Sequence, residues 1–340
     1  MVTSDHALYC WGSNDLGGLG TGDFRSADAP VRVAAPPVTE VELSHHRGCA
    51  ITVDRHVVCW GINANGESRP STERDPLPAN RPPVAYCGMG EDPDADHDNF
   101  VLRPTEIADV EGVVAIALGY HRTCVATEAG TVSCWGENRD DVFGAPTPRR
   151  SFVRRDVAHP GATALVTNTL GTYALDAAGR LSTVMTRAAS DEDEPVQAPP
   201  AVAFRELEWD DRGGCGRTDD RVVCWGQGGA CFMDDEQIGE WSVQVRARDV
   251  SVGWGTCMRC FVDDEGAARC WPSYDDRDQL ADDEAPFEHP WTLELPPVTR
   301  IEMGDYGGCA IAEDGQLWCF DLGTSSTPAQ RRPHLVTLTQ

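Results

Sequence analysis

The sequence predicts an all-β fold, a seven-bladed β-propeller in which residues 1–340 form a single domain. Three observations predict it: a hairpin that recurs with two cysteines, a repeat length near 49 residues, and several short strands per repeat without helical periodicity. The hairpins lie near residues 10, 59, 134, 183, 224, 270 and 319. A tandem of β-sandwiches is the alternative, but no repeat is long enough to close a core of its own.

Each repeat begins with a segment in which apolar residues alternate with others. Clear examples are residues 38–43, 113–118, 250–252 and 298–303. Alternation with a period of two is typical of half-buried strands. We therefore expect one such strand ahead of each hairpin.

The hairpin itself is clearest at residues 309–319, where two strands flank a three-residue turn that ends in Gly315. Gly130 and Gly266 hold the same position, where a left-handed residue is required. Facing residues of such a ladder have Cα atoms about 4.5–5.5 Å apart, and a disulfide accepts about 4.4–6.8 Å. We predict the hairpin disulfides Cys49–Cys59, Cys124–Cys134, Cys215–Cys224, Cys260–Cys270 and Cys309–Cys319.

One hairpin tests this pairing, because Tyr173 and Thr183 stand where both cysteines would be. Two cysteines that bond to each other are expected to be absent together, as they are here. The alternative to hairpin disulfides is that the cysteines are buried free thiols. Cys231 and Cys257 are candidates for a further pair, with a free Cys257 as the alternative. Cys257 and Cys260 also match a redox or zinc spacing, and the states of Cys10 and Cys87 stay open.

The amino-acid composition limits the cellular compartments and the kinds of partner that this protein can have. Fourteen cysteines with pairing geometry indicate an oxidising compartment, so we expect an extracellular, periplasmic or cell-surface protein whose export signal is absent from this chain. The chain has no lysine, which excludes a Walker lysine and a Schiff-base lysine. Its net charge of −27 argues against nucleic acid as a partner, and no segment is apolar enough to span a membrane.

The text of residues 9–23, Tyr-Cys-Trp-Gly-Ser-Asn-Asp-Leu-Gly-Gly-Leu-Gly-Thr-Gly-Asp, closely resembles the repeat of the regulator of chromosome condensation family. Partial copies begin at Trp60 and Trp135. The resemblance implies a seven-bladed propeller, and the cysteines resemble those of an exported bacterial branch. Family members include a guanine nucleotide exchange factor for a small GTPase, an ultraviolet sensor and a secreted inhibitor of an enzyme.

The two termini are predicted to meet in one incomplete or shortened blade. From Cys319 round to Cys10 there are 31 residues, against a repeat near 49. Residues 1–6 align with 51–56 and so begin inside the second strand of a blade. Residues 335–340 resemble the first strand of that same blade.

Between 69 and 100 the chain carries an acidic, proline-rich insertion. Asp92, Asp94, Asp96 and Asp98 place carboxylates at every second position, which suits calcium; a solvated acidic loop is the alternative, and we expect no other cofactor. No nucleophile motif, phosphate loop or other catalytic cluster is evident. His46 and His121, three residues before a hairpin cysteine, are expected to form hydrogen bonds between strands.

These observations predict a non-enzymatic, monomeric scaffold for protein–protein interaction. Its rigid strands would carry variable loops, notably 69–100, 191–194 and 275–284, and such loops are where recognition usually resides. The acidic charge favours a partner protein with a basic surface. The alternatives are a regulator of a small GTPase that resembles a guanine nucleotide exchange factor and, more remotely, a hydrolytic enzyme with a site at the propeller mouth.

Overall fold

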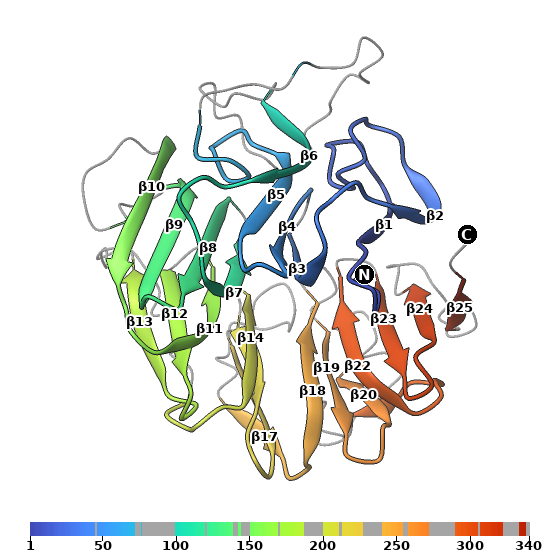
Figure 1. Ribbon diagram of the computed structural model, residues 1–340. Coiled ribbons are helices and arrows are strands. Elements are labelled where there is room, and N and C mark those ends of the chain that lie inside the picture. Colours follow the sequence, from blue (N-terminus) through green and yellow to red (C-terminus); the bar gives the residue numbers. More distant parts are fainter. Residues whose placement is uncertain are drawn as a thin grey trace, which may run out of the picture. The chain divides into compact units, whose positions relative to one another are not determined.

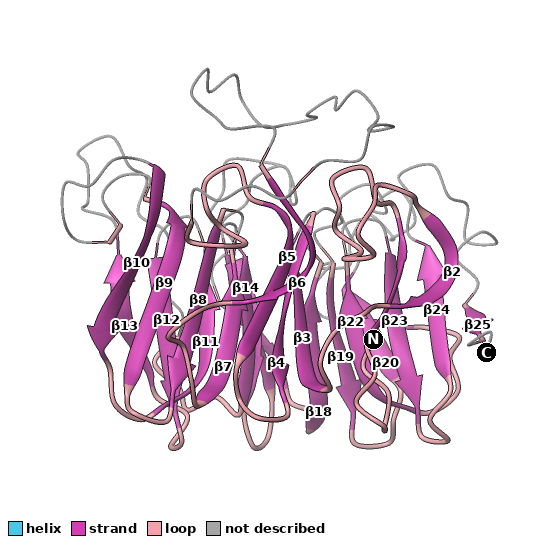
Figure 2. Cartoon of the chain, turned by 45° about the horizontal axis from the view of Figure 1, so that its top comes forward, coloured by secondary structure: helices cyan, strands magenta, loops and turns pink. Residues whose placement is uncertain are grey.

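The computed structural model describes the chain in fifteen ranges. These are residues 1–44, 46–71, 76, 99–119, 121–138, 142–143, 150–168, 171–186, 200–210, 213–226, 240–253, 258–271, 290–304, 307–321 and 333–337. Throughout these ranges the regular structure consists of β-strands (Figure 2). The prediction of an all-β chain is therefore confirmed.

The described strands form seven sheets, and in each sheet consecutive strands of the chain are neighbours (Figure 1). The first sheets are β1 (Tyr9–Gly12) and β2 (Ala27–Arg32); β3 (Val38–Ser44), β4 (Arg47–Thr52), β5 (Val57–Ile62) and β6 (Phe100–Glu106); β7 (Val113–Leu118), β8 (Arg122–Thr127), β9 (Thr131–Glu137) and β10 (Arg150–Ala158); and β11 (Ala162–Thr167), β12 (Gly171–Asp176) and β13 (Leu181–Thr186).

The remaining sheets each have four strands. They are β14 (Glu206–Asp210), β15 (Gly213–Arg217), β16 (Val222–Gly226) and β17 (Trp241–Val243); β18 (Ala247–Val252), β19 (Arg259–Asp263), β20 (Ala268–Trp271) and β21 (Trp291–Thr292); and β22 (Val298–Met303), β23 (Gly307–Ala312), β24 (Leu317–Asp321) and β25 (His334–Val336). The alternating segments found in the sequence are first strands, and the hairpins are second and third strands.

The fold is a β-propeller with six blades, so the predicted seven is wrong. Six sheets have three or four strands, whereas the sheet of β1 and β2 has only two. The two correspond to the third and fourth strands of a blade, and the residues ahead of β1 contribute a single bridge between Val2 and Leu8. The hairpin landmark at Cys10 therefore marks a two-stranded sheet and not a seventh blade.

The predicted place of the C-terminal strand is also wrong. Leu335 belongs to β25, which is the fourth strand of the sheet that begins with β22, and it faces Trp318 of β24. It does not join β1 and β2. Alternation of apolar residues fits a first or a fourth strand equally well, and the fourth strand of one sheet precedes the first strand of the next along the chain.

The chain divides into two compact units. One comprises residues 1–177, 182–190 and 338–340, and the other residues 178–181 and 191–337. In the first unit, β4 and β11 pack against β7. Cys49, Val57, Ile116 and Trp135 share one buried cluster there. In the second unit, β14 and β22 both pack against β18.

All five predicted hairpin pairs face each other in register and are joined as disulfides. Their Cα atoms lie 4.0–4.2 Å apart, slightly closer than we expected. Gly315 has a φ of 83°, the left-handed conformation that the turn requires. Cys49 and Cys59 are fully buried, so their disulfide is a part of the core.

The blade of β11, β12 and β13 contains no cysteine pair, and this makes it the place for an added one. We expect Tyr173→Cys combined with Thr183→Cys to form a sixth hairpin disulfide, since these positions match the cysteines of the other hairpins. The free energy of unfolding should rise by about 2–3 kcal/mol. Thermal unfolding of the double variant and of wild type, both without reductant, measures this, and Tyr173→Cys alone is the control. A double variant that melts at the same temperature as wild type, or that contains two free thiols at these positions, would contradict the expectation.

Candidate functional site

The connections between third and fourth strands leave each sheet at the end where its first and second strands meet, which we call the loop end. Antiparallel order dictates this, because the third strand runs in the same direction as the first. The connection from β5 to β6 contains the insertion 69–100, and the connection from β20 to β21 contains 275–284. Figure 2 shows the loops after β1 and β5 at this end of the first unit. The loop end is the candidate functional site.

Asn14 organises the first loop, which connects β1 to β2. Its side-chain Oδ1 accepts a hydrogen bond from Leu19 N at 2.9 Å. Its Nδ2 donates to Thr21 Oγ1 at 3.2 Å, Asp23 O at 2.9 Å and Arg25 O at 3.1 Å. Asn14 is 1% exposed. A single buried amide therefore holds the loop in one conformation.

The same asparagine recurs after β5 and β9, four residues beyond the second hairpin cysteine. Asn63 Oδ1 accepts from Ser68 N at 2.9 Å, and Asn138 Oδ1 accepts from Phe143 N at 2.8 Å. The asparagine of the Gly-x-Asn motif thus has a physical role, which is to hold the start of each loop by side-chain hydrogen bonds.

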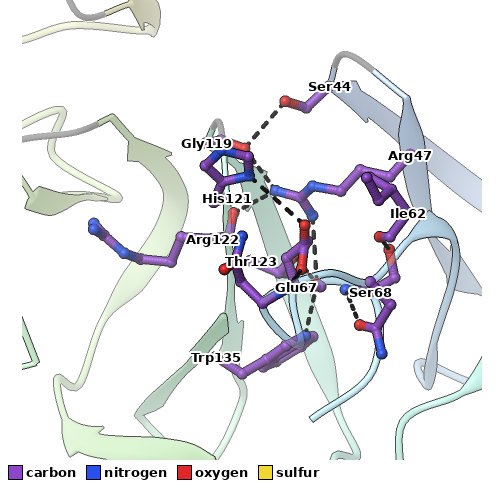
Figure 3. Close-up of polar contacts among 12 residues, drawn as sticks. Ser44, Arg47, Ile62, Glu67, Ser68, Gly119, His121, Arg122, Thr123 and Trp135 are labelled. Carbon is purple, nitrogen blue, oxygen red and sulfur yellow. Dashed lines mark hydrogen bonds and ion pairs between the residues drawn. The ribbon is translucent and has the colours of Figure 1, made fainter. Parts of the chain in front are cut away.

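The backbone oxygen of Glu67 joins two neighbouring sheets of the first unit (Figure 3). It accepts hydrogen bonds from Thr123 Oγ1 at 2.7 Å and from Trp135 Nε1 at 3.0 Å. Trp60 Nε1 makes the corresponding bond to Gly18 O at 2.8 Å, in the loop after β1. Each tryptophan that follows a second cysteine here fixes the loop of the preceding sheet.

Arg47, at the start of β4, crosses to the next sheet while buried (Figure 3). Its Nη1 donates to Thr123 Oγ1 at 2.5 Å, and its Nη2 donates to Gly119 O at 2.6 Å and Arg122 O at 2.7 Å. Burial lowers its pKa to about 10, while the charge of Glu67 opposes this shift. The guanidinium stays protonated at neutral pH and links two sheets by binding carbonyl oxygens.

Arg122 occupies the same position as Arg47 in the following sheet, two residues before a hairpin cysteine. Its Nη1 donates to Asn168 O at 3.2 Å, in the loop after β11. The arrangement is therefore repeated along the first unit. In both cases the guanidinium binds a backbone carbonyl of the next sheet and so holds two sheets together.

His121 lies beside this network, and its Nδ1 is 3.6 Å from Glu67 Oε1. Glu67 is fully buried, and its Oε2 accepts from Asn65 N at 2.6 Å. His46 is exposed, but its backbone oxygen accepts from Ile62 N at 3.2 Å. Both histidines therefore lie at the loop end, where strands and loops meet.

Three carboxylates lie on neighbouring first strands of the second unit. Burial and the charge of Glu206 raise the pKa of Asp249 to about 6, and burial and the charge of Asp249 raise the pKa of Glu302 to about 7. Asp249 Oδ2 also accepts from Ile301 N at 2.7 Å, which joins β18 to β22. The side chain of Glu302 is nevertheless exposed to solvent, and water that screens its charge reduces the effect of this shift on stability.

These pKa shifts predict a pH dependence of stability. A carboxyl whose folded pKa is raised binds its proton more tightly in the folded chain, so its stabilising effect is complete below the unfolded pKa near 4. That effect is lost as the pH rises through about 7 for Glu302. We expect Glu302→Gln to be more stable than wild type at pH 8 and to lose this advantage by pH 5. Denaturant unfolding across this pH range checks the difference.

The control for that experiment is Glu294→Gln, which removes the same charge from an exposed side chain nearby in the sequence. Its difference from wild type should stay nearly constant with pH. Parallel curves for the Glu302 variant and wild type would contradict the assigned shift.

Several predicted residues lie outside the described ranges. They are Cys87, Cys231, Cys257 and the calcium candidates Asp92, Asp94, Asp96 and Asp98. Cys10 is described; it is a buried free cysteine, and burial raises its pKa. In the described ranges no three His, Cys, Asp or Glu side chains are grouped so that they could hold a metal ion.

Arg47 and Glu67 are not among the residues predicted from the sequence. The signal for Glu67 was present, because it stands where the family repeat has the glutamine of Gly-Gln-Leu-Gly. The signal for Arg47 was its recurrence as Arg122.

Among the described residues there is no helix of the length and apolarity that would cross a bilayer.

Two segments, residues 5–51 and 113–141, match the family model described as Regulator of chromosome condensation (RCC1) repeat. The chain is 27% identical over 151 residues, 43% of its length, to the human E3 ubiquitin-protein ligase HERC2. It spans only 3% of that relative, so the alignment concerns a small part of HERC2.

Solved structures show the same fold. Human WBSCR16 has a TM-score of 0.66 and 14% identity, with 98% of this chain and 95% of that one covered. Yeast RCC1 (Prp20), solved with Kap60 bound, has a TM-score of 0.69 and 14% identity, with 99% and 85% covered. The repeat motif and the two matched segments confirm the predicted resemblance: the chain contains RCC1-type repeats, and the solved structures share its fold.

Proposed function

We propose that the protein is a non-enzymatic, monomeric binding propeller that holds a partner protein through its loop end. One observation carries the proposal: the longest and most acidic connections, including 69–100 and 275–284, leave their sheets at the loop end. The described hairpins at the opposite end are short. Loops that vary on a rigid scaffold are where binding usually resides.

The described part of the loop end supports a preorganised surface. Asn14 and Asn63 fix the beginnings of two loops, and Arg47 and Trp135 fix Glu67 between two sheets. Binding costs less when loops need no further ordering. This favours recognition of a folded partner over recognition of a disordered one.

A partner with a basic surface fits the charge of the chain, which is −27. Opposite charge raises the rate of encounter and makes it sensitive to salt. Five disulfides fit a location outside the reducing cytosol. We place the protein in the extracellular space, the periplasm or the cell surface, as in the exported bacterial branch that the cysteines resemble.

Nucleotide exchange on a small GTPase is the second candidate, because the fold is that of yeast RCC1. It would require a reduced, cytosolic protein. A hydrolytic enzyme is a more remote candidate. Among the described carboxylates, Asp249 and Glu302 have the raised pKa values that hydrolysis uses. Asp249 is 6% exposed and bonded to Ile301 N, a placement that serves the link between two sheets.

The experiment uses the whole chain as bait with two variants. One replaces residues 72–98 at the loop end by a short Gly-Ser linker, and the other replaces Val53 and Asp54 in the hairpin between β4 and β5 by serines. We expect one protein from an extracellular fraction to bind wild type and the hairpin variant, to be lost from the loop variant and to weaken in high salt. Equal binding to all three, or nucleotide exchange on a purified GTPase, would contradict the proposal.

A further inference from the structure

Two buried asparagines at the base of the insertion carry polar atoms that have no hydrogen-bond partner among the described residues. Asn63 is fully buried and Asn99 is 1% exposed, and they are adjacent because Asn63 N donates to Asn99 O at 2.9 Å. Among the described residues, Asn63 Nδ2 and both side-chain polar atoms of Asn99 have no hydrogen-bond partner. Buried amides of this kind are rarely left unbonded.

The first repeat of the same chain shows what such an amide normally does. Asn14 holds the position of Asn63, and its Nδ2 donates to three acceptors, on Thr21, Asp23 and Arg25. In the second repeat the insertion begins at residue 69, close to the sequence position at which the first repeat supplies those acceptors. Asn63 keeps its other role, since its Oδ1 accepts from Ser68 N at 2.9 Å and Arg69 N at 2.8 Å. The unsatisfied Nδ2 is therefore a local consequence of the insertion.

The chemistry of these atoms restricts what can bind there. Two amide nitrogens need acceptors, and Asn99 Oδ1 needs a donor. A metal cation is disfavoured by the amide hydrogens, and an anion by the buried carboxylate of Glu67 in the same loop. A neutral hydroxyl group both accepts and donates, and water is the hydroxyl ligand that buried polar groups usually hold.

We propose that Asn63 and Asn99 form a buried water site, in which at least one ordered water molecule bridges the two side chains. The bridge joins the residue that precedes the insertion to the residue that follows it. It thereby closes the base of the insertion with hydrogen bonds that the described residues do not supply. This inference does not depend on the proposed function.

A direct test is a crystal structure of the wild-type chain at a resolution that shows ordered water. We expect a water within about 3.2 Å of Asn63 Nδ2 and of the Asn99 amide, the upper limit of an N–H···O hydrogen bond. Side chains or carbonyls of residues 72–98 at that place, a metal ion, or amides facing an empty space would each overturn the proposal.

A second test uses Asn99→Leu, which replaces the amide by an apolar group of similar size. If water is bound, the variant loses its bonds and leaves Asn63 Nδ2 unsatisfied, so the melting temperature falls. If the amide is unbonded, the apolar group is neutral or stabilising. Water-relaxation dispersion should also count at least one fewer long-lived water in the variant. An unchanged count or a raised melting temperature would overturn the proposal, and the wild-type structure decides if the variant does not fold.

Discussion

Replacing Cys49 and Cys59 together by alanine is expected to lower the free energy of unfolding by about 2–3 kcal/mol. The disulfide closes a short hairpin loop and restricts the unfolded chain. Both residues are fully buried, and alanine avoids placing hydroxyl groups in the core. Guanidinium unfolding under non-reducing conditions measures the difference.

Reductant provides the control for this pair. Once the hairpin disulfides are reduced, the wild type loses the same constraint, so the gap between it and the variant should shrink. The wild type should also unfold at much lower denaturant when reduced, because all five disulfides are lost. Equal stability of wild type and variant without reductant would show that these sulfurs are not bonded.

Arg47→Ala is expected to cost about 3–5 kcal/mol, because removing one partner of a buried charged network leaves the others unsatisfied. The carbonyls of Gly119 and Arg122 would lose their donor. Arg47→Lys should recover little, since one ammonium group cannot reach the same set of acceptors as a planar guanidinium. Denaturant unfolding measures both variants.

Arg55→Ala is the matched control, because Arg55 pairs with Glu128 between neighbouring hairpins but is about half exposed. Exposed pairs contribute about 0–1 kcal/mol. A loss for Arg47→Ala no larger than that for Arg55→Ala would contradict the role assigned to the buried guanidinium.

The hairpins could be predicted because their determinants are local. Turn glycine, cysteine spacing and alternation all act within about a dozen residues, and the pairs such as Cys309 with Cys319 face each other as expected. The count of blades could not be predicted in the same way. It depends on which strands complete a sheet, and the patterns around Cys10 and Leu335 do not contain that information.

The network at the loop end was missed for a related reason. Arg47 binds Gly119 and Thr123, which lie more than seventy residues further along the chain. No local pattern marks such a contact, and a buried arginine runs against the usual placement of charge. Comparison between repeats would have helped, since Arg47 and Arg122 hold one position and Glu67 stands in the place of a family glutamine.

Counting the cysteines that react with an alkylating agent before reduction tests the central claim most directly. Disulfides that join two strands within each of five sheets are the reason for placing this protein outside the reducing cytosol. Mass spectrometry of the folded, natively produced protein should find at least ten of the fourteen cysteines protected until reductant is added. The same protein is also alkylated after unfolding in denaturant without reductant, so that buried free thiols can react. Twelve or more alkylated cysteines in that sample would contradict the presence of the disulfides.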